Sequence, residues 1–145
     1  MDRAARAALF RALALAGAAG ALAVAGALLG RAPDPRLVRE GHDVRSPSGR
    51  YAARVDVSTA DDGTRLWCPV VVDERGVEVF RSEGHFASGK GLTVTWEPGL
   101  DTLWIVAAEV GTFFVQEGPT AWSATALTRA TADLLPAEVR AMRGD

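Results

Sequence analysis

Four carboxylates near the ends of expected strands are the side chains of this chain whose type and spacing best suit catalysis. They are Glu97, Asp101, Glu109 and Glu117. Two carboxylates that flank a sugar can act as the acid and base of a glycosidase. Asp and Glu are also frequent in turns, and a β domain of roughly 115 residues has little room for a deep substrate cleft. We therefore predict that the protein is not an enzyme, and keep a small carboxylate-dependent hydrolase as a third hypothesis.

A glycine-rich segment matches part of a nucleotide-binding motif. Residues 84–91 read GHFASGKG, in the GxxxxGK frame of a phosphate-binding loop. Gly91, however, stands where a Ser or Thr would bind magnesium, and residues 92–96 alternate like a strand instead of opening a helix. We interpret the segment as a loop between two strands and predict no nucleotide.

Histidine and cysteine are too scarce for a metal centre built from these residues. The chain has His42, His85 and a single cysteine, Cys68. A structural zinc site takes four such ligands, so we predict no metal and no other cofactor. Cys68 lies between Trp67 and Pro69 in an apolar run, and we expect it to be buried.

Aromatic residues carry the positive hypothesis about function. Trp67 and Trp104 alternate away from the neighbouring Leu66 and Leu103, and so face the opposite side of their strands. Burial in the core is the favoured interpretation of each tryptophan. If one sheet face is left uncovered, Trp67, Trp104 and Phe114 form the candidate interaction surface for a partner protein or a saccharide.

Hydrophobic alternation with a period of two predicts an all-β fold. Six or seven strands follow one another at intervals of about eight to twelve residues, separated by Gly, Pro and Asp turns. This pattern predicts a small antiparallel meander, as a sandwich or a partly open barrel, followed by a short C-terminal helix over residues 136–143. The expected strands cover residues 51–58, 66–73, 77–81, 92–96, 102–108, 112–116 and 121–126.

Two turns suggest a faint internal repeat. The segment SPSGRYAARV begins at Ser46, and EPGLDTLWIV begins at Glu97, each with a Pro-containing turn before a strand. The first resembles, over about ten residues, the SPDGK-type hairpin of β-propeller repeats. A propeller needs at least four blades and the chain is too short for them, so this resemblance implies at most two propeller-like sheets packed face to face.

An apolar segment near the N-terminus predicts membrane association. The uncharged stretch starts at Ala12, ends at Gly30 and reaches roughly 28 Å as a helix, close to the thickness of a bilayer core. Gly26 and Gly30 form a GxxxG pair that permits helix packing in a membrane. The favoured interpretation is a signal anchor; the alternative is a signal peptide cleaved near Ala27, which would release a small secreted binding or inhibitor protein.

The distribution of charged residues predicts the orientation of the chain in the membrane and the bounds of the exported domain. Basic residues 1–11 should stay cytoplasmic, so that residues 31–145 are exported. These exported residues carry a net charge of −4, which argues against nucleic acid as a partner. We interpret residues 31–49, rich in Pro, Asp and Arg, as a linker and residues 50–145 as the extracytoplasmic β domain.

Composition completes the prediction of function. The chain lacks Asn, has one Lys against fifteen Arg and is rich in Ala, as in GC-rich bacterial genomes. We expect a single-pass protein of a bacterial cell membrane whose exported domain is a non-enzymatic interaction or envelope-associated module.

Overall fold

The computed structural model describes residues 33–87 and 91–142. Residues 34–145 form a compact unit separate from residues 1–33. The predicted membrane segment, with Gly26 and Gly30, lies outside the described residues. Among the residues that are described, no helix has the length and apolar character needed to cross a membrane.

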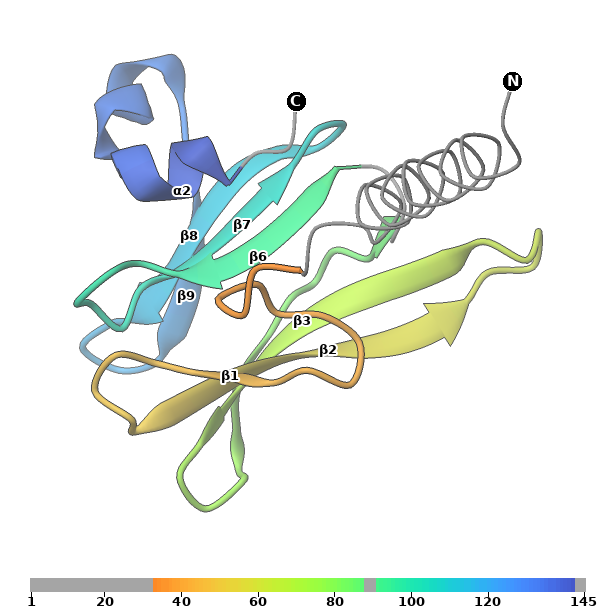
Figure 1. Cartoon of the computed structure of the whole chain (residues 1–145), viewed down its shortest axis with the longest axis horizontal. Coiled ribbons are helices and arrows are strands. Elements are labelled where there is room, and N and C mark those ends of the chain that lie inside the picture. The colour runs from red at the N-terminus through yellow and green to blue at the C-terminus, as the bar shows by residue number, and fades with distance from the viewer. Residues whose placement is uncertain (1–32, 88–90, 143–145) are drawn as a thin grey trace, which may run out of the picture. The chain divides into compact units, whose positions relative to one another are not determined.

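Two antiparallel sheets make up the described domain (Figure 1), which confirms the all-β prediction. The first sheet has the order β1-β2-β3-β4, with β5 also paired to β3; the second has the order β6-β7-β8-β9. The strands are β1 (Val44–Arg45), β2 (Tyr51–Thr59), β3 (Arg65–Asp73), β4 (Glu78–Arg81), β5 (Phe86–Ala87), β6 (Leu92–Trp96), β7 (Leu103–Ala107), β8 (Gly111–Glu117) and β9 (Trp122–Ala126). In each sheet, with the exception of β5, strands that follow one another in the sequence are neighbours, which makes an antiparallel meander.

One hydrophobic core is shared by the two sheets. It combines inward residues of β2 and β3, such as Ala53 and Val71, with inward residues of β6 and β7, such as Val94 and Ile105. All five residues of β7 are buried, which explains why the sequence of this strand is apolar at successive positions. The inner face of β7 contributes to the shared core, and its outer face is covered separately.

The C-terminal residues cover the outer face of the second sheet. A 3₁₀ helix, η1 (Arg129–Leu134), precedes the short helix α2 (Ala137–Ala141). Leu135 and Val139 pack on Trp104 and Val106 of β7. A five-residue helix is too short to be stable alone, and so this one depends on the contact.

Residues 34–49 differ from the predicted linker, because part of the segment belongs to the folded domain. The amide of Val38 donates to the carbonyl of Val94 in β6, at 2.8 Å, and Val38 itself is only 2% exposed. Val44 then pairs with Ala53 in β2, and its carbonyl accepts a 2.8 Å hydrogen bond from Trp96 Nε1. The sequence did not predict these contacts, because the segment contains few apolar residues among its proline and charged residues.

The two proline-containing turns meet in the folded domain. Ser48, in the turn after β1, donates from its amide and its hydroxyl to the carboxylate of Asp101, in the turn after β6, at 3.1 and 2.5 Å. Arg50 lies 3.6 Å from the same carboxylate. Burial raises the pKa of Asp101, but the hydrogen bonds from Ser48 outweigh it and the pKa is lowered overall. A charged hydrogen-bond acceptor therefore joins the two sheets at this end.

We predict that Asp101→Asn destabilises the domain by about 1–2 kcal/mol at pH 7, because Ser48 then donates to a neutral acceptor. The folded-state pKa of Asp101 is lowered, so the contribution of this carboxylate is complete above the unfolded value of about 3.9 and disappears as the pH falls through the folded value. Urea unfolding of both proteins should show a difference in the free energy of unfolding that shrinks as the pH falls below this unfolded value. Asp61→Asn, at an exposed turn residue, is the control; a difference that stayed constant with pH would contradict the assignment.

Candidate functional site

Of the three aromatic residues proposed as an interaction surface, Trp104 and Phe114 lie together, and Trp67 lies apart from them on the other sheet. Trp67 is half-buried and packs against the core shared by the sheets. Trp104 is 2% exposed and lies on the outer face of β7, with Phe114 at 5.6 Å between ring centroids, beneath the C-terminal residues. The α2 helix covers the face that the sequence left open, so Trp104 is not available on a surface.

The four carboxylates divide between the two ends of the second sheet. Glu97 accepts a 3.0 Å hydrogen bond from Trp104 Nε1, and Glu117 accepts a 2.9 Å hydrogen bond from the hydroxyl of Tyr51. Asp101 binds Ser48, at the same end. Glu109 follows β7 and lies in the turn at the opposite end. Three of the carboxylates thus hold turns and aromatic side chains in place.

The glycine-rich segment, predicted as a loop, contains the two-residue strand β5 and ends where β6 begins. Gly84 precedes β5, and Gly91 leads directly into β6, where a phosphate-binding loop would open a helix. Residues 88–90 lie outside the described part of the chain. Cys68 is buried as predicted, with its thiol 3.4 Å from the carbonyl of Ser82.

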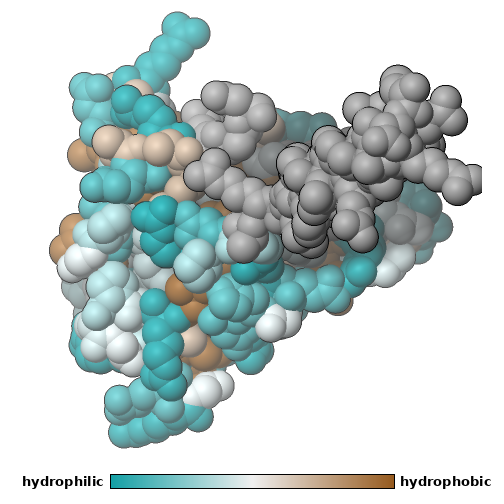
Figure 2. All heavy atoms as spheres, in the orientation of Figure 1, coloured by the Kyte–Doolittle hydropathy of each residue, from teal (hydrophilic) through white to brown (hydrophobic). Residues whose placement is uncertain are grey.

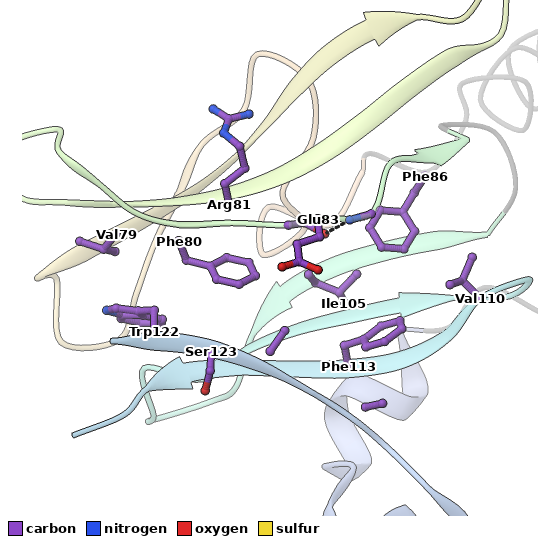
Figure 3. Close-up of a pocket in the computed structure, with 14 residues that line it drawn as sticks. Val79, Phe80, Arg81, Glu83, Phe86, Ile105, Val110, Phe113, Trp122 and Ser123 are labelled. Carbon is purple, nitrogen blue, oxygen red and sulfur yellow. Dashed lines mark hydrogen bonds between the residues drawn. The ribbon is translucent and has the colours of Figure 1, made fainter. Parts of the chain in front are cut away.

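The two sheets are joined along one side and separate along the other. At the joined side, Val38 forms a hydrogen bond with the edge strand β6 of the second sheet. The chain then continues into β1, which pairs with β2 of the first sheet. At the other side, β4 and β9 are the edge strands, and no described strand bridges them. In Figure 3, the chain of β9 runs away from β4 as it leaves Trp122. The shared core therefore opens to solvent between β4 and β9.

A cavity of about 730 Å³ occupies this open side, and we call it the β4–β9 cleft. Most of its lining is apolar and comes from both sheets (Figure 3). The apolar lining residues are Val79, Phe80, Phe86, Ile105, Val110, Phe113, Trp122, Ala124 and Ala126. Its volume lies in the range of pockets that take small ligands or partner side chains.

Small side chains on β9 explain why the cleft is not filled. Ala124 pairs with Val115, and Ala126 pairs with Phe113, and both of these partners point toward the shared core. Ala124 and Ala126 therefore face inward, yet both are exposed. A larger residue at either position would reach toward β4. Val110, at the mouth of the cleft, is 61% exposed.

An aromatic cluster closes one end of the cleft. The Trp122 ring packs edge-on against Tyr51, at 4.7 Å between centroids, and against Trp96, at 6.4 Å. Burial, and then the hydrogen bond to Glu117, raise the pKa of the Tyr51 hydroxyl. The cluster joins β2, β6 and β9, and thereby holds the two sheets together at this end.

One carboxylate faces the cleft. Figure 3 shows the Glu83 side chain, on the segment between β4 and β5, directed into the space near Phe80, Phe86 and Ile105. Arg81 points the other way, and its guanidinium pairs with Glu78 and Asp56, each at 2.7 Å. Within the described residues, no ion pair reaches Glu83. The cleft thus combines an apolar wall with a negative charge at its rim.

Apolar exposure elsewhere is scattered. The face shown in Figure 2 is mostly hydrophilic among the described residues, with hydrophobic atoms in small separate patches. Exposed Val77, just before β4, and exposed Leu134, in η1, do not line the cleft. The β4–β9 cleft is therefore the candidate functional site.

Sequence reasoning missed this site because its lining residues look like ordinary core residues. The usable signal was β9 itself, which reads WSATA and places alanines where an inner face should carry large side chains. The described residues hold no group of three or more His, Cys, Asp or Glu arranged to bind a metal ion. Comparisons of the chain with protein-family models, with curated proteins and with solved structures found no match.

Proposed function

We propose that the domain is a non-enzymatic binding module whose β4–β9 cleft receives an apolar group of a partner. The observation that supports this proposal is an unfilled apolar cavity between two otherwise well-packed sheets. Leaving apolar side chains exposed costs stability, and such concentrated exposure marks binding sites in many proteins. A bound apolar group would bury the exposed faces of Val110, Ala124 and Ala126.

A protein partner suits the cleft better than a saccharide. Saccharide binding uses flat aromatic faces that are open to solvent. Trp104 is buried, and Trp67 packs against the shared core, so neither offers such a face. The lining of the cleft is instead a mixture of aliphatic and aromatic side chains from both sheets, which suits the apolar side chains of another protein.

We also propose that the chain is anchored in a bacterial cell membrane by residues 12–30, with the β domain on the extracytoplasmic side. The uncharged length and the basic residues before it support this location. Intact mass of the chain from alkaline-washed membranes should equal that of the full-length protein. A soluble chain beginning at Leu28 would contradict the anchor and support secretion.

Binding of the neutral apolar dye Nile red tests the proposed function. We expect saturable dye fluorescence with the wild-type domain, and binding about tenfold weaker for Ala124→Phe, because a ring at this position occupies the cleft. Thr125→Phe is the matched control, since Thr125 is the neighbouring exposed residue and faces the other side of β9. Equal dye binding by the two variants would show that the dye does not enter the cleft and would contradict the proposal.

A further inference from the structure

The free edges of the two sheets differ in how they are protected against pairing with another strand. The edge of β6 is covered by Leu37 and Val38. The edge strand β4 carries Glu78 and Arg81, and its pairing with β3 is interrupted by a register shift, both of which discourage strand addition. On the outer side of the first sheet, β1 has only two residues.

The strand β9 has none of these protections. Its five residues, WSATA, include no charge and no proline, and its pairing with β8 is continuous from Trp122 to Ala126. In the described part of the chain, β9 pairs with no strand but β8. An uncharged, regular edge strand is a template for pairing with another chain.

The backbone of β9 places alternate hydrogen-bonding groups on this free edge. The amide of Leu127 donates to the carbonyl of Thr112 on β8, at 2.8 Å. Residues of an antiparallel strand alternate between bonding one neighbour and the other. The amides and carbonyls of Ala124 and Ala126 therefore point away from β8 and are available to an added strand.

The same two residues turn their side chains toward the cleft. In an antiparallel pair, residues directly opposite each other project to the same face of the sheet. Residues of an added strand opposite Ala124 and Ala126 would therefore project into the cavity, toward Phe80 and Phe113. Glu83, which has no ion pair within the described residues, faces this space (Figure 3) and would attract a basic residue.

We propose that an extended peptide segment of the partner occupies the cleft and adds to β9 as an antiparallel strand. It places two apolar side chains, spaced two residues apart, in the cleft and a Lys or Arg beside Glu83. This inference rests on the proposed function of the cleft, and adds the way in which a partner binds.

Synthetic seven-residue peptides test this inference. Each alternates Thr with Val, Leu or Phe between terminal Lys residues. The control peptides carry N-methyl groups on the two apolar residues, which leaves the side chains unchanged but removes the amide donors that face β9. We expect saturable binding of at least one peptide, slower hydrogen exchange of the Ala124 and Ala126 amides on binding, and affinity at least about tenfold lower for its N-methylated form.

A proline variant supplies a second readout on the protein. Ala124→Pro removes an outward amide and no bond to β8, so we expect the variant to fold and to bind the peptide at least about tenfold more weakly than the wild-type protein. If this variant does not fold, the N-methylated peptides still decide the question.

The outcomes separate the inference from the proposed function. Equal binding of methylated and unmethylated peptides, or no change in exchange at Ala124 and Ala126, would overturn strand addition. Binding of Nile red by a protein that binds none of the peptides would overturn strand addition while the cleft remains a binding site. Binding of neither probe would overturn both proposals.

Discussion

Burial of the two inner sheet faces against each other is the interaction on which the described domain depends. Neither sheet has another apolar layer of its own on its inner face, so each sheet supplies half of the core that the two share. Val94, Leu103 and Val115 from one sheet and Ala53 and Val71 from the other are almost completely buried. Turn contacts, such as those of Ser48 with Asp101, fix the position of the sheets but bury little apolar surface.

The asymmetry between the two sides of this core gives the domain its binding potential. On one side, residues 37–45 bond to β6 and pair with β2, and thereby exclude water from the core. On the other side, no segment within the described residues covers the core in this way, and Ala124 and Ala126 stand at two of the inward positions of β9. The same shared core that stabilises the fold therefore ends in an apolar cleft, which needs no separate loop or cofactor to form it.

The sequence predicted most strands because alternation is a strong local signal, but it could not predict which faces are covered. Apart from the two-residue β5, which the sequence did not predict, strands from Tyr51 onward appear near the expected positions, including the weakly patterned β9. Trp104 could not be distinguished from a surface residue, because its covering residues, Leu135 and Val139, lie about thirty positions later. The burial of Val38 was likewise not predicted, because the residues around it are mainly prolines and charged residues. The cleft depends on the spacing of β4 from β9, a tertiary property that local periodicity does not encode.

The central claim is that the inner face is completely packed at β2 and unfilled at β9, and matched substitutions of two inward alanines test it most directly. Ala53 is fully buried in β2, whereas Ala124 is exposed in β9. Denaturant unfolding should show that Ala53→Ile costs about 1–3 kcal/mol by overpacking, while Ala124→Ile leaves stability unchanged or raises it by up to about 1 kcal/mol. A loss at Ala124 equal to that at Ala53 would mean that the space beside β9 is already filled, and would contradict the account.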